Sequence, residues 1–218
     1  MFGQPDYDPI KHSEDITDFE EQLEALNEAV KSGKVRWVGV SNETPFGVMK
    51  MVGLAERYPD LYPRIVSIQN SYSLLVRKDY EAGLSEVCAD HNCNIGLLAY
   101  SPLAAGVLTA KYSKAEVDPK ARLKQFKGYM ERYKDSQVET AVKEYEEVAK
   151  KHGISPTALA LSWCYHRHGI VASTIIGATT MEQLEQNLKA YDVNLNDTVI
   201  EDISKVYKKY VDPSKAYN

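Results

Sequence analysis

Polar side chains follow three short apolar runs of the sequence, at the point where each run ends. Ser41-Asn42 closes the first run, Gln69-Asn70 closes the second and Tyr100-Ser101 closes the third. Their hydroxyls and amides can donate and accept hydrogen bonds, and the ring of Tyr100 offers a flat face for stacking. Each also has a structural interpretation, as part of a turn, as a partner for a neighbouring backbone group or as a core aromatic. Their coincidence at equivalent positions favours a shared ligand site.

A fourth apolar run leads through Gly177-Ala178-Thr179 into a helix whose start is marked by Thr180-x-x-Gln183. Glycine lets a ligand approach the backbone, and a helix N-terminus presents unpaired N–H groups and partial positive charge. The segment therefore suits a phosphate, although an ordinary strand-to-helix turn has the same composition. No GxGxxG motif occurs, so a Rossmann-type dinucleotide site is not supported.

The elements that would position these residues alternate along the chain. The apolar runs are residues 35–40, 64–68, 94–99 and 171–176, and the first three start about 30 residues apart, which is the length of a βαβ unit. Continuous apolar runs suit strands that are buried on both faces of a parallel sheet. Such strands fit a small doubly wound sheet or part of a (β/α)8 barrel, and four strands make half a barrel the better description.

Helices are expected between and after these strands. A capping box at Thr17-x-x-Glu20 opens the first helix and Gly33 ends it, and Thr44-Pro45 opens the second. Residues 78–91 read as a third helix. The Thr180 helix should carry one apolar face, made of Met181, Leu184, Leu188 and Tyr191.

Three further segments complete the pattern. Residues 101–135 show no sustained period, and a connection of that length usually serves or covers a site. Two helices then follow, one stopped by Gly153 and one opened by Ser155-Pro156, which is apolar nearly all round and should be buried. A last helix is expected over residues 197–210.

Composition limits the possible partners. The chain has 218 residues with 26 basic and 31 acidic side chains, a net charge of −5, which argues against nucleic acid as the main partner. No apolar run approaches the roughly 20 residues of a membrane span, and the N-terminus does not resemble a signal peptide. The three cysteines fit free thiols in a reducing compartment, and a metal site on Cys88, His91 and Cys93 lacks a second ligand pair, so no metal is expected.

Four ordered motifs resemble those of the aldo-keto reductase superfamily, from about Glu20 to Leu188. They are Gly39-Val40-Ser41-Asn42, Ser67-Ile68-Gln69-Asn70, Tyr100-Ser101-Pro102-Leu103-x-x-Gly106 and Ile176-Gly177-Ala178-Thr179 with Gln183, Gln186 and Asn187 downstream. The Gly177-Ala178-Thr179 form is most similar to the branch of potassium-channel β-subunits and Tas-like reductases. The resemblance implies strands five to eight of a (β/α)8 barrel and an NADPH/NADP site.

The resemblance also implies a role for each candidate residue. Asn42 and Gln69 would hold the nicotinamide carboxamide with Ser41 beside them, and Tyr100 would stack on the nicotinamide ring. Ser101, Leu103 and Ala105 would line the pyrophosphate, and Lys111 would add a cation in a loop that folds over the cofactor. The residues around the adenine and the 2′-phosphate would be Gly177, Thr179, Gln183, Gln186 and Asn187. Gln186 departs from the family pattern, which has Glu there. Taken alone, Lys111 and Arg122 also read as solvated charges.

No catalytic residue is expected in this chain. The family's Asp, Tyr, Lys and His group lies on its first four strands, and the matching positions are absent here. The histidines (His12, His91, His152, His166 and His168) read as surface residues away from strand ends, and Tyr7 has no lysine partner.

The sequence is therefore expected to be one aldo-keto reductase domain over residues 1–218, truncated at the N-terminus, with residues 1–16 as a loop. The complete protein would reduce small carbonyl compounds to alcohols with NADPH, and this chain would be inactive alone. The alternative is a non-catalytic nucleotide-sensing or scaffolding subunit whose half-barrel another chain or an oligomer completes. A cytoplasmic location is expected, or an organelle such as the chloroplast if a transit peptide precedes Met1.

Overall fold

The computed structural model describes residues 17–113, 116–117, 119, 121–126 and 128–215, so the expected loop over residues 1–16 lies outside the described residues. The described chain divides into two compact units. The first unit comprises residues 17–70 and 80–98, and the second comprises residues 71–79 and 99–215. Each unit is described separately below.

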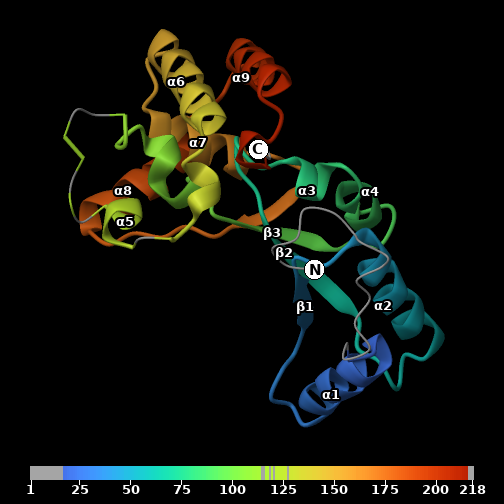
Figure 1. Ribbon diagram of the computed structural model, residues 1–218. Helices are drawn as coiled ribbons and strands as arrows, with labels where there is room; N and C mark the ends of the chain where they lie inside the picture. Colours follow the sequence, from blue (N-terminus) through green and yellow to red (C-terminus); the bar gives the residue numbers. More distant parts are fainter. Residues whose placement is uncertain (1–16, 114–115, 118, 120, 127, 216–218) are drawn as a thin grey trace. The chain divides into compact units, whose positions relative to one another are not determined.

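Four strands form one sheet in the order β1-β2-β3-β4 (Figure 1), which confirms the expected α/β class with a parallel sheet. The strands are β1 (Val38–Ser41), β2 (Ile65–Ser71), β3 (Gly96–Tyr100) and β4 (Val171–Thr174). β1 and β2 run parallel, with Val40 opposite Ile68 and Ser41 opposite Gln69. Strand β1 starts later than expected, because Val35 and Trp37 are exposed rather than paired, and β4 ends at Thr174 rather than at residue 176.

The first unit packs α1 (Phe19–Lys31) against α2 (Pro45–Arg57), and α2 against α4 (Leu84–Cys88). The Asn27 side-chain amide donates to the carbonyls of Asp60 and Leu61, at 3.0 and 2.8 Å, which ties α1 to the segment before β2. The stop at Gly33 (φ +72°) is confirmed, and the Thr44 hydroxyl caps α2 by accepting from the Gly47 N–H at 3.1 Å.

Two predictions for helices near the first unit are wrong. The capping box at Thr17 does not form, because α1 begins at Phe19 with Asp18 as N-cap and the Thr17 carbonyl instead accepts from the Gln22 side chain. The single helix over residues 78–91 is two short helices, α3 (Lys78–Glu81) and α4. They separate at Gly83, where a Cβ would lie 3.2 Å from Pro45 at the start of α2, so only glycine fits without displacing that ring.

The second unit centres on α7 (Pro156–Tyr165), whose residues 159–164 are all buried, as expected for a helix apolar nearly all round. Helix α7 packs against α6 (Ser136–Lys151), α8 (Met181–Lys189), β4 and the 3-10 turns η2 (Ala104–Thr109) and η4 (Ala190–Asp192) (Figure 1). Helix α9 (Asp197–Lys209) packs on α6. The expected structureless segment 101–135 contains η2, α5 (Arg122–Gln125) and η3 (Glu131–Tyr133). The last short turn is η5 (Pro213–Lys215).

The apolar face expected for α8 is largely exposed, with only Leu184 half-buried. Met181 is 77% exposed, Leu188 is 58% exposed and Tyr191 is 63% exposed. The inward side of α8 is instead polar, because Asn187 is buried and donates to the Gly177 carbonyl at 3.1 Å. The apolar spacing in the sequence does not indicate this hydrogen bond to the turn before the helix.

Candidate functional site

The ends of β1 and β2 bring Ser41, Asn42 and Gln69 together in the first unit. The Ser41 hydroxyl and the Asn42 N–H both donate to the Gln69 carbonyl at 3.1 Å, and the Asn42 side-chain amide donates to the Ser41 hydroxyl at 2.8 Å. Asn42 has φ +54°, a left-handed conformation that asparagine tolerates better than most residues. These contacts set the Asn42 amide and the Ser41 hydroxyl side by side and tie both residues to the backbone of Gln69.

Asn70 belongs to the same group, although its only expected role was to close the second apolar run. Its side-chain oxygen accepts from the Asn42 N–H at 3.0 Å, and the residue is 4% exposed. The buried amide therefore fixes the strained backbone at Asn42. Its place next to Gln69 in the motif was the only signal in the sequence.

The segment after β3 carries a run of left-handed residues. Ser101, Ala104, Ala105 and Gly106 have φ values of +57°, +48°, +57° and +88°. Ala104 and Ala105 are two adjacent non-glycine residues in this region, which is unusual, and such strain concentrates at ligand-binding loops. The Gly106 N–H donates to the Leu103 carbonyl at 2.8 Å, which closes the turn, so Ser101, Leu103 and Ala105 lie in one tight loop.

Lys111 lies against this loop. A Cβ at Gly106 would lie 2.5 Å from the Lys111 Nζ, so the ammonium occupies the space beside the backbone that a side chain at Gly106 would need. The Nζ is also 5.2 Å from the centre of the Tyr112 ring. The ammonium is thereby held beside the left-handed run.

The turn before α8 connects Gly177, Thr179, Gln183 and Asn187. The Gln183 side-chain oxygen accepts from the Thr179 N–H and hydroxyl, at 2.9 and 3.1 Å, and the Thr180 hydroxyl accepts from the Gln183 N–H at 3.2 Å. The second capping box is thus half confirmed: Thr180 caps the helix, but the Gln183 side chain holds Thr179 instead of the Thr180 N–H. Gln186 stands apart, exposed and bonded to Glu182 at 3.3 Å.

The candidate residues therefore form three local groups. The strand-end amides lie in the first unit, whereas the loop after β3 and the turn before α8 lie in the second unit. Within the second unit, η2 and α8 both pack against α7. The loop after β3 and the turn before α8 are therefore both positioned by this helix. Thr179 and Gln183 are exposed, so their polar atoms remain accessible.

Three polar residues that no sequence motif indicated are Ser71, at the end of β2, and Arg132 and Tyr133, in η3. Ser71 accepts a 3.4 Å hydrogen bond from Arg132, and both lie in the second unit with Tyr133. Tyr133 is 3% exposed, and its hydroxyl and the Arg132 Nε are buried without a hydrogen-bond partner. Burial raises the pKa of Tyr133, so the hydroxyl keeps its proton. Arg132 and Tyr133 lie in the segment without a period, which explains why no pattern indicated them.

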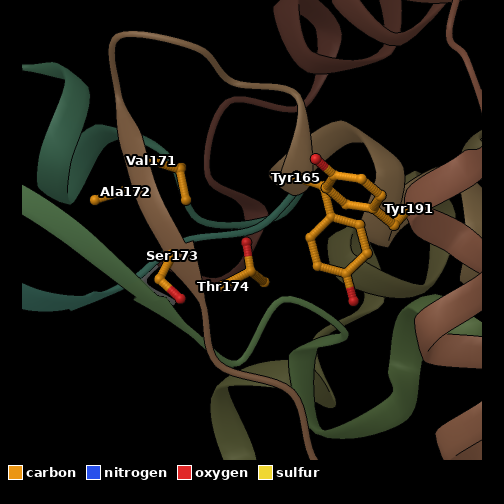
Figure 2. Close-up of a pocket in the computed structure, with 6 residues that line it drawn as sticks. All are labelled: Tyr165, Val171, Ala172, Ser173, Thr174 and Tyr191. Atoms are coloured by element: carbon orange, nitrogen blue, oxygen red, sulfur yellow. The ribbon is translucent and has the colours of Figure 1, made fainter.

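A pocket of about 240 Å³ lies along strand β4 in the second unit (Figure 2). All four residues of β4 line it together with Tyr165 and Tyr191, whose ring centres are 5.8 Å apart. The Thr174 hydroxyl is buried and has no hydrogen-bond partner. The pocket contains none of the residues expected to bind the cofactor, and it follows the edge strand of the described sheet.

The described histidines and cysteines do not follow strand ends. Among the described histidines, His91 and His168 are exposed as expected, whereas His152 and His166 are half-buried. All four follow helices rather than strands. The cysteines are free thiols, with Cys88 and Cys164 buried and Cys93 half-buried, and burial raises the pKa of Cys88 to about 11. In the described part of the chain, no group of three or more His, Cys, Asp or Glu side chains could hold a metal ion, and no helix has the length and apolarity needed to span a membrane.

Comparison with known proteins identifies the family. The model of the aldo/keto reductase family matches residues 5–208. Protein tas of Escherichia coli is 43% identical over 192 residues, which are 88% of this chain and 54% of that protein. An aldo-keto reductase of Babesia bovis is 37% identical over 205 residues, 92% of this chain and 70% of that protein.

A third relative defines the branch. A probable voltage-gated potassium channel subunit beta of Arabidopsis thaliana is 32% identical over 179 residues, 81% of this chain and 53% of that protein. The chain thus spans about half the length of several curated relatives that it matches. Its motifs and these similarities together show that the chain belongs to the aldo/keto reductase family, in the branch of Tas-like proteins and potassium-channel β-subunits.

Proposed function

We propose that this chain supplies the NADP(H)-binding part of an oxidoreductase that interconverts small carbonyl compounds and alcohols. The observation that carries the proposal is the sequence of ligand-suited groups at the carboxyl ends of successive strands: amides after β1 and β2, a strained loop after β3 and a capped helix after β4. In parallel α/β folds these strand ends form the ligand-binding face. Membership of the aldo/keto reductase family supports the reaction class.

The donor set suits a pyridine nucleotide. The amides of Asn42 and Gln69 match the hydrogen-bonding pattern of a carboxamide, and Ser41 adds a hydroxyl. The bare backbone at Gly106 leaves room for the Lys111 ammonium beside the left-handed loop, where it suits an anionic pyrophosphate. The N-terminus of α8 favours negative charge, and the hydroxyl of Thr179 is exposed there. These residues therefore fit a ligand with an amide at one end and phosphates further along.

Each group has a distinct task in this proposal. Asn42 and Gln69 orient the nicotinamide, and Tyr100 supplies a stacking face. Ser101, Leu103, Ala105 and Lys111 bind the pyrophosphate, and the adenosine end is held by Gly177, Thr179, Gln183, Gln186 and Asn187. Bound NADPH would supply hydride to the carbonyl carbon. Among the described residues we assign no proton donor for the carbonyl oxygen, since no histidine follows a strand end.

Two measurements test this proposal. NADPH fluorescence titration of the purified 218-residue chain should show saturable binding. NADPH consumption with 4-nitrobenzaldehyde should stay at the rate without protein, because the chain's assigned residues bind cofactor but do not protonate the product. Absence of saturable NADPH binding would refute the cofactor role, and robust turnover would show that the chain contains an acid we have not assigned.

We also propose that β1 to β4 are strands five to eight of a (β/α)8 barrel and that both units belong to one aldo-keto reductase domain. The family match across residues 5–208, which covers parts of both units, supports the single domain. Free thiols at Cys88, Cys93 and Cys164 are compatible with a reducing compartment such as the cytoplasm.

A second candidate function is a non-catalytic nucleotide-sensing or scaffolding subunit. Its support is the relative described as a probable potassium channel subunit beta, together with β1 and β4 as the outer strands of the described sheet. An outer strand offers unpaired backbone groups to another chain. Sedimentation velocity distinguishes the candidates: a stable, specific oligomer that binds NADPH favours the subunit, and a monomer favours the reductase fragment.

A further inference from the structure

We propose that Arg132, Tyr133 and Ser71 form a binding site for an oxyanion, a carboxylate or a phosphate monoester carried by the carbonyl substrate. The inference deepens the proposed reductase function. It rests on that function, because the bound anion belongs to a carbonyl substrate only if the chain is part of a reductase. The site itself rests on the contacts of these three residues within the second unit.

The first observation is a pair of buried donors without partners. The Tyr133 hydroxyl and the Arg132 Nε both lie out of contact with solvent, and neither makes a hydrogen bond. A buried polar group without a partner costs roughly 1–3 kcal/mol, so native proteins rarely leave two on adjacent residues unless something else binds there. Both atoms are donors toward an oxygen, because guanidinium nitrogens only donate and burial keeps the phenol protonated.

The second observation is an uncompensated charge. No carboxylate of a described residue lies within ion-pair distance of Arg132, whose contacts are a 3.4 Å hydrogen bond to the Ser71 hydroxyl and the Tyr133 ring, 4.8 Å from the guanidinium carbon. A half-buried guanidinium without a counter-charge favours an anion, and its fork of N–H groups matches a carboxylate or phosphate in a two-bond arrangement.

The third observation is the position of the cluster. Ser71 ends β2 and Tyr100 ends β3, and the Tyr72 N–H donates to the Tyr100 carbonyl at 3.1 Å, so these two strand ends are adjacent. Tyr133 lies close enough to Ser71 and Tyr100 for both to influence its pKa. The cluster therefore borders the residue proposed to stack on the nicotinamide, where an anionic group of a reacting carbonyl compound would be near its partner.

The test compares three probes that share a phenyl ring and differ in the polar group attached to it. Benzoate, phenyl phosphate and neutral benzamide are titrated into the full chain while the Arg132 Nε–H resonance is followed by NMR. We expect benzoate or phenyl phosphate to shift this resonance and to bind at least about tenfold more tightly than benzamide. The anion that binds more tightly shows whether the site prefers a carboxylate or a phosphate monoester. Equal binding of anion and amide, or no shift at Arg132, would overturn the proposal and leave a buried water as the partner of these donors.

Variants separate binding from a structural role. Arg132→Gln should abolish the preference for the anion, and Tyr133→Phe should weaken anion binding several-fold, whereas Arg36→Gln removes an exposed positive charge and should change neither. Unaltered anion preference in Arg132→Gln, with only a lower melting temperature, would assign Arg132 to structure and refute the site. NADPH affinity is measured on the same samples, so failure of the cofactor proposal is recognised independently of the anion result.

Discussion

Asn42 is the residue on which the cofactor proposal can be tested most directly, because its side chain bonds to Ser41 and its backbone to Gln69 and Asn70. We expect Asn42→Ala to weaken NADPH binding about tenfold, the equivalent of roughly 1.4 kcal/mol for lost amide hydrogen bonds. Fluorescence titration measures this change. Asn194→Ala, at an exposed position, is the matched control. Equal NADPH affinity of Asn42→Ala and the parent chain would contradict the role of Asn42.

At the scale of residues, the contacts that could be predicted from the sequence are those within short motifs. The Ser41–Asn42 and Thr179–Gln183 contacts form between residues that are near in sequence and belong to the same short motifs. The Arg132–Ser71 contact spans 61 positions. Long-range pairing of this kind depends on how the chain folds back, which neither period nor composition encodes.

At the scale of elements, α7 is the helix that the second unit packs around. Leu161 is fully buried in it. Leu161→Ala should lower the free energy of unfolding by about 2–5 kcal/mol, because it removes buried methyl groups and leaves a cavity. Urea denaturation followed by circular dichroism measures the loss. Leu188→Ala on the exposed face of α8 should cost far less, and similar losses for the two variants would contradict the assigned burial.

The packing of α6 on α9 depends on a charge cluster around Asp202. Its carboxylate accepts from Lys151 at 2.6 Å, from Lys205 at 2.8 Å and contacts the His152 Nε2 at 2.9 Å. The hydrogen bonds from Lys151, Lys205 and His152, in that order, hold the pKa of Asp202 well below its usual range. A carboxyl whose pKa is lower in the folded state stabilises the fold above its unfolded pKa, about 3.9, and this contribution disappears as the pH falls through the folded pKa.

Asp202→Asn should therefore melt at a lower temperature than the parent chain at pH 7. The difference between the two proteins should shrink as the pH is lowered below about 4. Thermal melts across a pH series measure this effect, with Asp192→Asn at an exposed position as the control. A difference that stays constant down to pH 2 would show that Asp202 acts through packing rather than charge.

Element types could be predicted from the sequence better than their limits. Gly33, Thr44 and Ser155 marked helix ends correctly, because each acts through its own backbone or side chain. The division at Gly83 and the exposed face of α8 were missed. Gly83 lies against the Pro45 ring and Asn187 bonds to the Gly177 carbonyl, and the local spacing of residue types does not reveal either contact.

At the scale of the whole molecule, the two tryptophans report on different environments. Trp163 is 3% exposed and stacks on Tyr72 with ring centres 5.1 Å apart, whereas Trp37 is 73% exposed. We expect Trp37→Phe to leave a blue-shifted emission that acrylamide quenches poorly, and Trp163→Phe to leave a red-shifted emission that acrylamide quenches readily. Equal quenching of the two variants would contradict this distribution.

The whole fold could be predicted as α/β with four parallel strands, because strand and helix patterns alternate regularly in the sequence. The grouping into two compact units could not be predicted. The boundaries pass through β2, α3 and β3 rather than through a linker. The β4 pocket was likewise missed, since it depends on Tyr165 and Tyr191 meeting a strand edge.

Gly106 gives the chain a position at which a neutral substitution would relocate a charge. An added methyl group would occupy the space next to the Lys111 Nζ and force the φ of +88° on an alanine. The ammonium would have to swing away, although the formal charge of the protein would be unchanged. Sequence variation at this one small residue could therefore tune how strongly the loop attracts phosphate without any exchange of acidic or basic side chains.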